Sequence, residues 1–167
     1  MMTESDRSGV TIRAAEEQDT PVLLRLTREM AAYEGQADIF ALTEPALRNA
    51  LFGQRPLAEA IIAEDGGEPV GFALFFPYFS PFPGVPGLFM ELLYVVSERR
   101  GQGLGRALFQ EVARIAVERG ADRLEWGVLK ENVPAIGFYT RFGATMVDDF
   151  KAGRLEGETL RRVAGAE

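Results

Sequence analysis

The sequence contains no cysteine and no histidine. Without cysteine there can be no disulfide, no thiolate nucleophile and no thiolate-bound zinc, and without histidine the commonest general base and metal ligand is missing. Acid–base chemistry must therefore be done by Glu, Asp, Tyr or Lys side chains. No apolar run approaches the roughly 18 residues that cross a bilayer, and the first ten residues lack the apolar stretch of a secretory signal. We expect a cytoplasmic protein with no metal and no membrane partner.

Positive charge is also scarce. The 167 residues carry 18 basic and 25 acidic side chains, which gives a formal charge of −7. Such an excess repels nucleic acid, so we expect no nucleic-acid partner, and it attracts cationic solutes, although it can equally serve only to keep the protein in solution. The length is that of one domain. We expect a disordered tail over residues 1–9 and a single domain over residues 10–167.

The expected order of elements is β-α-α-β-β-β-α-β-α-β, an α+β fold with a mixed sheet and helices on both faces. Apolar periodicity predicts strands over 10–13, 58–63, 70–76, 88–96 and 122–129, with an Asp-Gly-Gly turn that joins the second and third. Helices are predicted after the N-cap candidates Asp19 and Thr43, from 104 to a stop at Gly120, and over 134–142. Short apolar runs near 146–147 and 154–155 are expected to supply the last strand.

Four prolines lie between Pro77 and Gly87, and they predict an irregular loop there because proline removes a ladder donor. The aromatic residues of this stretch, Tyr78, Phe79 and Phe82, are expected to line or cover a site.

The most informative stretch is the glycine-rich run from Arg100 to Gly105, between a buried strand and an amphipathic helix. Glycines let main-chain amides approach an anion, and the amides at a helix N-terminus carry partial positive charge. Taken alone, such a run is as well explained by a tight turn that needs glycine for steric reasons. A dinucleotide fingerprint would need glycine where Arg106 stands, and a P-loop would need a Gly-Lys-Ser/Thr ending. What remains is the pattern Arg/Gln-x-x-Gly-x-Gly/Ala, matched by Arg100, Gly103 and Gly105.

This pattern resembles the acetyl-CoA pyrophosphate loop of the GNAT N-acetyltransferases. The runs Glu91–Val96, Asn132–Tyr139 and Arg141–Ala144 around it resemble the diamine (spermidine/spermine) acetyltransferase branch, and Leu26–Glu34 and Arg154–Glu158 fit it too. The resemblance implies a GNAT fold with splayed parallel strands 4 and 5, acetyl-CoA as co-substrate, and a homodimer. It also implies transfer to a primary amine of a small molecule by direct attack in a ternary complex.

The resemblance implies two catalytic residues. Glu91 is the general base; as the one carboxylate in an apolar strand it is expected to be buried with a raised pKa, whereas without the resemblance a solvated or Arg-paired carboxylate is the favoured interpretation. Tyr139 is the general acid near the sulfur of coenzyme A, and the alternative is a core tyrosine beside Phe138 and Phe142. Asn132 can contact the cofactor, cap a helix or do both.

The expected binding residues form two sets. The cofactor set comprises Leu93, Tyr94, Val95, Arg100, Gly101, Gln102, Gly103, Leu104, Gly105, Arg106, Asn132, Ala135, Ile136 and Tyr139. Within it, a main-chain amide of the 93–95 segment is expected to polarise the thioester carbonyl. The acceptor set comprises Arg28, Glu29, Tyr33, Glu34, Glu91, Leu92, Glu125 and Trp126. A solvated helix face is an equally good interpretation of its first four members.

Two residues depart from the polyamine-acetylating pattern of the family. Leu92 stands where those relatives have Asp directly after the base, and Phe150 stands where a tryptophan is expected. Both departures favour another primary amine, such as a lysine-like amino acid. A non-catalytic acyl-CoA sensor and an enzyme that acetylates protein amines are the competing hypotheses. The presence of Glu91 and Tyr139 argues against the sensor, and a cleft narrowed by the proline-rich stretch would disfavour a polypeptide.

Overall fold

The computed structural model describes residues 9–148 and 152–166, which form two compact units divided between Gly127 and Val128. The first unit contains a five-stranded sheet of order β1-β2-β3-β4-β5. All neighbouring strands are antiparallel except β4 and β5, which are parallel. The mixed sheet confirms the prediction. Its strands are β1 (Val10–Ala14), β2 (Glu59–Asp65), β3 (Glu68–Ser80), β4 (Val85–Val95) and β5 (Arg123–Trp126).

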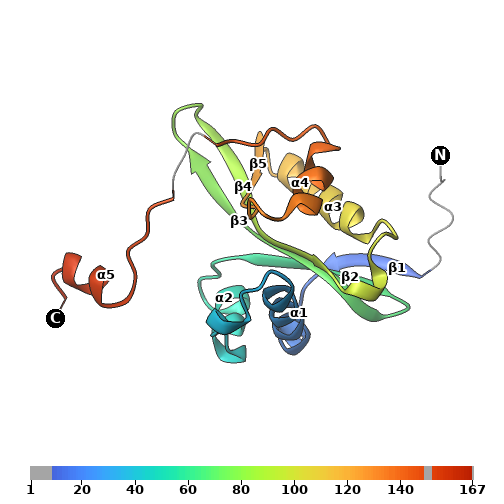
Figure 1. The fold of residues 1–167 in the computed structure, drawn as a ribbon, viewed down its shortest axis with the longest axis horizontal. Coiled ribbons are helices and arrows are strands. Elements are labelled where there is room, and N and C mark those ends of the chain that lie inside the picture. Colours follow the sequence, from blue (N-terminus) through green and yellow to red (C-terminus); the bar gives the residue numbers. More distant parts are fainter. Residues whose placement is uncertain (1–8, 149–151, 167) are drawn as a thin grey trace. The chain divides into compact units, whose positions relative to one another are not determined.

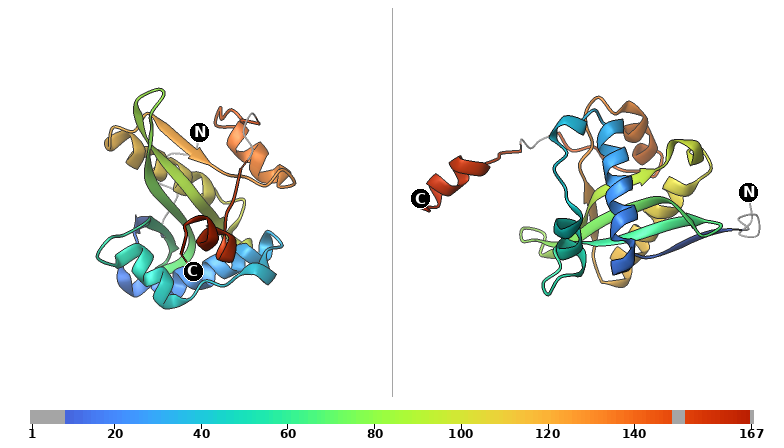
Figure 2. Two further views of the ribbon diagram at one scale, coloured as in Figure 1. Left: turned by 90° about the vertical axis from the view of Figure 1, so that its left-hand side faces the viewer. Right: turned by 90° about the horizontal axis from the view of Figure 1, so that it is seen from below.

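Helices cover both faces of this sheet, as predicted. Helices α1 (Thr20–Tyr33) and α2 (Glu44–Phe52) lie against one face and α3 (Leu104–Glu118) against the other (Figures 1 and 2). The cluster under α1 and α2 is built from Leu23, Leu26, Leu47, Leu51, Ala60, Ile62, Phe72 and Tyr94. Each buried leucine in such a cluster contributes about 1.5–3 kcal/mol relative to an exposed one. The pairing of strands and this cluster together fix the end of β4 beneath α1.

Three predicted boundaries, namely a helix cap, a turn between strands and a helix end, are confirmed. The hydroxyl oxygen of Thr43 accepts a hydrogen bond from the Ala46 amide and caps α2. Gly66 and Gly67 both have positive φ, as the two-residue turn between β2 and β3 requires. Gly120 ends α3 in the left-handed region at φ 73°.

Asp19 does not cap α1 with its side chain, contrary to the prediction. Its carboxylate instead accepts two hydrogen bonds from Arg13, at 2.7 and 2.9 Å, and one from the Glu16 amide. Arg13 also donates to Glu64 of β2. A guanidinium fork satisfies a buried carboxylate better than one helix amide does, so Asp19 joins β1 to the start of α1.

The irregular loop predicted over Pro77–Gly87 is wrong. Strand β3 continues to Ser80 and β4 begins at Val85, so Pro77 and Pro86 both lie in strands. Beyond Phe75 strand β3 pairs with β4 alone, and an edge without a ladder tolerates a residue that has no N–H. Tyr78 is half-buried, whereas Phe79 and Phe82 are exposed.

The second unit contains α4 (Val133–Thr140) and α5 (Gly157–Val163). The predicted last strand is wrong for the described residues, because 144–148 and 152–156 have no regular structure. Two adjacent apolar residues are too short a run to bury one face of a strand. Leu160 and Val163 have helical spacing and belong to α5. Phe150 lies outside the described residues. No helix in the described part of the chain is long and apolar enough to cross a membrane.

Candidate active site

The glycine-rich run forms a turn at the N-terminus of α3, with main-chain geometry that suits an anion. Gly101 and Gly103 have φ of 75° and 83°, so both positions need a residue that tolerates the left-handed region. No main-chain carbonyl of the described residues accepts a hydrogen bond from the amides of Gly101 to Gly105. Free amides at the start of a 15-residue helix bind phosphate groups well.

The glycine at position 105 distinguishes this loop from a turn shaped only by protein sterics. A Cβ on Gly105 would meet only Val95 Cγ2, at an ordinary contact distance of 3.8 Å, and a Cβ on Gly101 would meet nothing within 4 Å. The protein itself therefore does not require glycine at 105. The bare backbone leaves room for a ligand to approach the amides, and the residues present fit a pyrophosphate.

Strand β4 has an open edge next to this loop. Its parallel pairing with β5 runs from Gly87 to Met90 and stops there. Because Val96 N–H donates to Val70 O, and because antiparallel pairs alternate, the main-chain groups of Leu93 and Val95 face away from β3. No described strand pairs with that edge. It offers hydrogen-bonding groups to an extended ligand such as the pantetheine arm.

Glu91 lies where the pairing of β4 with β3 shifts its register and the pairing of β4 with β5 ends. The register passes from Leu74 opposite Leu92 to Phe75 opposite Met90, so Glu91 is the extra residue of a β-bulge. The expectation that Glu91 is buried is wrong, because the side chain is exposed. A bulge leaves its extra residue out of the ladder and redirects its side chain, and bulges of this kind are frequent beside active sites.

The acceptor residues of α1 lie near the end of β4 that adjoins the loop. Glu29 forms an ion pair with Arg25 at 2.7 Å, and Glu34 is partly buried, which raises the pKa of its carboxyl. Tyr33 lies 4.1 Å from the guanidinium carbon of Arg100, measured to the ring centroid. Arg28 is on another side of the helix, with its guanidinium over the ring of Phe40.

Glu29 reaches toward the same corner. Burial raises the pKa of the Tyr94 hydroxyl, and the negative charge of Glu29 raises it further. The structure thus brings Glu29, Tyr33, Tyr94 and Arg100 together. Leu92, next to Glu91, packs against the core cluster under α1 and α2.

Glu125 and Trp126 are adjacent on β5, and their side chains lie on opposite faces of the sheet. Trp126 packs edge-on against Phe109 of α3, on the face away from α1. Glu125 accepts a hydrogen bond from the Tyr78 hydroxyl. Burial, together with this bond to Glu125, raises the pKa of Tyr78 to about 12. The structure therefore does not bring Trp126 to the α1 residues. It pairs Glu125 with Tyr78, one of the aromatic residues expected to line or cover a site.

The remaining predicted residues belong to the second unit. Asn132 caps α4, since its Oδ1 accepts from the Ala135 amide at 3.2 Å, and Ile136 follows in the first turn. Tyr139 is buried, and its ring meets that of Phe138 edge-on at 5.0 Å. The helix-cap interpretation of Asn132 and the packing of Tyr139 are both observed, and neither excludes a cofactor contact.

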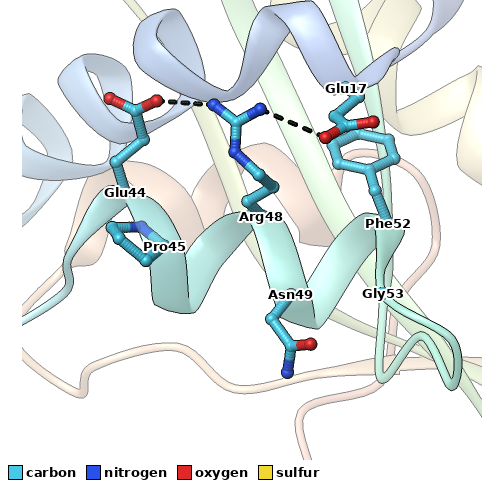
Figure 3. A pocket seen from close by; sticks show the side chains of 7 residues that line it. All are labelled: Glu17, Glu44, Pro45, Arg48, Asn49, Phe52 and Gly53. Carbon is cyan, nitrogen blue, oxygen red and sulfur yellow. Dashed lines mark hydrogen bonds and ion pairs between the residues drawn. The ribbon is translucent and has the colours of Figure 1, made fainter.

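A separate pocket of about 540 Å³ lies beside α2 and contains none of the predicted site residues (Figure 3). In it Arg48 lies between Glu44 and Glu17 and pairs with both, at 2.6 and 3.1 Å. The ion pairs satisfy the charged groups of this pocket, so it presents no reactive group.

Residues 26–144 match the model of the acetyltransferase (GNAT) family. The chain belongs to this family. It is therefore an N-acetyltransferase, and membership implies acetyl-CoA as its co-substrate. The chain is 35% identical to thialysine N-epsilon-acetyltransferase of Sus scrofa, over 95% of this chain and 99% of that protein.

Two further similarities agree with this assignment. The chain is 31% identical to the spermidine/spermine N(1)-acetyltransferase-like protein 1 of Homo sapiens, over 86% of this chain and 21% of that protein. Among solved structures, an integron cassette protein from the mobile metagenome of V. cholerae has a TM-score of 0.79 at 26% identity and covers 95% of this chain and 99% of that one. The relatives confirm the resemblance to the diamine acetyltransferases, and the solved structure confirms the GNAT-like α+β fold.

Proposed function

We propose that this N-acetyltransferase transfers an acetyl group from acetyl-CoA to a primary amine of a small amino-acid-like or diamine substrate, by direct attack in a ternary complex. The observation that carries the proposal is the continuity of three features along the chain. The bulged carboxylate of Glu91, the open edge at Leu93 and Val95, and the free amides of Gly101 to Gly105 follow one another within 15 residues of the first unit.

The chain's own groups account for cofactor binding. The amides of Gly101 to Gly105 bind the pyrophosphate, and the outward main-chain groups of Leu93 and the outward N–H of Val95 bind the pantetheine arm. When bound, acetyl-CoA supplies the activated acetyl group. An outward amide of the 93–95 segment stabilises negative charge on the thioester oxygen. By the family resemblance, Asn132, Ala135 and Ile136 are further proposed cofactor contacts.

Glu91 and Tyr139 divide the proton transfers between them. Glu91 accepts a proton from the substrate ammonium, and because its side chain is exposed a water molecule can carry the proton between them. The neutral amine then attacks the thioester carbon, the C–S bond breaks, and the second proton that the nitrogen loses passes through water to restore the Tyr139 hydroxyl after it has protonated the thiolate. The Tyr139 hydroxyl donates a proton to the departing thiolate. No metal takes part in this scheme.

The residues proposed to surround the amine, here called the acceptor corner, indicate the class of substrate. The carboxylates of Glu29, Glu34 and Glu91 favour a cationic amine, and Leu92 supplies an apolar surface in place of a fourth carboxylate. The pig relative is named for thialysine, a lysine analogue, whereas the human relative is named for spermidine and spermine. One fewer carboxylate favours a substrate with fewer positive charges, so we place the lysine-like amino acids ahead of the polyamines.

We also propose that both compact units belong to one catalytic domain, because the family match over residues 26–144 crosses the division at Gly127. The family resemblance implies a homodimer, and the cytoplasm is the location that we propose. Light scattering on the purified protein measures the mass directly and decides between monomer and dimer.

A panel of amines tests the proposed function. Release of coenzyme A is measured with thialysine, lysine, ornithine, putrescine, spermidine and a lysine-containing peptide, and mass spectrometry locates the acetyl group. We expect the highest kcat/KM for an amino acid with a terminal amine. A peptide as the best substrate would contradict the proposal, and so would tight acetyl-CoA binding with no turnover on any amine.

A further inference from the structure

Arg100 begins the pyrophosphate loop, yet its side chain turns back toward the body of the first unit. Its Nε donates a hydrogen bond to the carbonyl of Val95 at 2.9 Å. Its guanidinium carbon lies 4.1 Å from the ring centroid of Tyr33 and 5.4 Å from that of Tyr94. In the described residues no carboxylate forms an ion pair with it. Arg100 therefore contacts the end of β4 and the last residue of α1 at once.

The bond to Val95 occupies a particular position on the open edge of β4. The carbonyl of Val95 is the last outward-facing group of the strand, since Val96 already bonds to β3. By taking this carbonyl, Arg100 ends the edge that is left for the pantetheine arm. The guanidinium donates to a main-chain carbonyl and contacts two aromatic rings at the same time, a combination that suits arginine better than lysine.

The two rings near Arg100 differ in exposure. Tyr94 is buried in the core cluster, whereas Tyr33 is 54% exposed at the end of α1. Tyr94 is thus held by core packing, whereas the contact with Arg100 is a main restraint on the ring of Tyr33. Tyr33 is the last residue of α1. Glu34 follows it directly and Glu29 lies one turn earlier, so the position of Tyr33 sets the positions of both carboxylates.

We propose that Arg100 is a positioning residue for the amine acceptor, which fastens the end of α1 to the junction of β4 with the pyrophosphate loop through Tyr33. Arg100 acts on the amine through α1 and does not serve as a phosphate ligand. This inference rests on the proposed function in one respect, namely that the amine binds beside the end of α1.

Two substitutions and a matched control test the proposal. Arg100→Met keeps most of the side-chain length but removes the charge and the hydrogen bond, and Tyr33→Leu removes the ring. Arg99→Met removes a charge one residue earlier, where Arg99 pairs with Asp65 at 2.5 Å and touches neither Tyr33 nor Val95. Any general effect of lost positive charge on the anionic cofactor is therefore present in the control. Titration calorimetry gives the Kd for acetyl-CoA without an amine, and initial rates give kcat and KM for the best amine.

We expect Arg100→Met and Tyr33→Leu each to raise the amine KM by about 5- to 20-fold, the range for loss of one partly desolvated cation–ring contact, with kcat changed less than about threefold. The double variant should be no worse than the single ones, because both remove the same contact. The acetyl-CoA Kd of Arg100→Met should equal that of Arg99→Met.

Either of two results overturns the proposal. One is an acetyl-CoA Kd for Arg100→Met that is tenfold weaker than for Arg99→Met, which would make Arg100 a phosphate ligand. The other is additive effects of Tyr33→Leu and Arg100→Met on the amine KM. If the wild-type protein acetylates no amine, the proposed function fails, and the calorimetric comparison still decides whether Arg100 binds phosphate. Tyr33→Leu alters an exposed ring, so it supplies a folded variant even if Arg100→Met is unstable.

Discussion

At the scale of single residues, Glu91 shows how a small change of register prepares a group for chemistry. Its neighbours Met90 and Leu92 each have a partner on β3, whereas Glu91 has none and its side chain is exposed. An exposed carboxylate can pass a proton on to water after each turnover, which a sealed one cannot. In the proposed mechanism the bulge provides both the direction of the side chain and the route for the proton.

Replacing Glu91 by Gln should lower kcat/KM by about 100-fold, at the lower end of what general-base assistance contributes, because positioning and main-chain polarisation remain. The two side chains are nearly isosteric, so folding should be unaffected. At higher pH more of the substrate amine is already neutral, and the deficit of the variant should shrink. Rate profiles from pH 6 to pH 10 for both proteins measure this. Equal rates throughout would remove Glu91 from the mechanism.

A valine at position 103 should weaken acetyl-CoA binding by at least about tenfold, because a branched side chain blocks the approach of phosphate to the amides and opposes a positive φ. Gly120→Val is the matched control, since Gly120 ends the same helix with φ 73° and imposes a similar backbone strain. Thermal unfolding and acetyl-CoA titrations are compared for both. Similar losses of stability with a cofactor defect only in Gly103→Val are expected, and an unchanged Kd in folded Gly103→Val would reject the loop.

Some of the site could be predicted from residue types and some could not. The glycine pattern from Arg100 to Gly105 has a local physical meaning, so its position at the start of α3 was predictable. The exposure of Glu91 was not, because a bulge depends on how two strands pair and leaves no mark in an apolar run. The contact of Arg100 with Tyr33 joins residues far apart in the chain, and only the fold brings them together.

At the scale of elements, an ionic cluster fastens β1, β2 and the start of α1. The side chain of Asp19 is 8% exposed and that of Glu64 is 16% exposed, and both accept hydrogen bonds from Arg13. The bonds from Arg13 hold the pKa of Asp19 below its usual range against the opposing effect of burial. A carboxylate whose pKa falls on folding stabilises the folded state at every pH where it is ionised.

Asp19→Asn should lower the free energy of unfolding by about 1–2 kcal/mol at pH 7, the range for losing charge-assisted hydrogen bonds that are partly screened by solvent. Because the folded pKa is depressed, the contribution is complete above the ordinary value of 3.8 and is lost as the pH falls through the lower folded value. The difference between the two proteins should thus be constant above pH 5 and shrink below pH 4. Urea unfolding at several pH values measures it.

Glu17→Gln is the control for this experiment, because Glu17 lies in the same short turn but pairs only at the surface with Arg48. It should leave the free energy of unfolding unchanged within error. A difference between wild type and Asp19→Asn that persists unchanged at pH 2 would show that the charge of Asp19 is not the source of the stability.

Element order was largely predictable because caps and turns act locally. The Thr43 cap, the Gly66–Gly67 turn and the glycine after α3 each marked a boundary correctly. The loop prediction was wrong at Pro77 and Pro86, because the missing N–H of a proline matters only where a neighbouring strand would accept a hydrogen bond from it. The last strand failed for a different reason, because two adjacent apolar residues are too short a run to bury one face of a strand.

At the scale of the whole molecule, the formal charge of −7 acts on two reactants of opposite sign. It opposes the approach of the anionic cofactor, so the proposed binding of acetyl-CoA has to depend on the local field of the amides at Gly101 to Gly105. It favours the approach of a cationic amine over longer distances, adding to the carboxylates at the acceptor corner. The summed charge acts over a long range, whereas the amides and carboxylates act at short range, and salt therefore separates the long-range effect from the local contacts.

Salt should change the preference of the enzyme among amines of different charge. At about 0.01 M ionic strength the screening length is about 30 Å, and at 0.15 M it is about 8 Å, so only short-range interactions survive in the second case. The ratio of kcat/KM for spermidine, with three positive charges, to that for lysine, with a net charge of one, should fall by about 3- to 10-fold between these conditions. Taking the ratio at saturating acetyl-CoA cancels effects of salt on the cofactor and on the protein itself. A ratio that does not move would mean that the negative charge serves only to keep the protein in solution and that the acceptor is selected by contacts at the site alone.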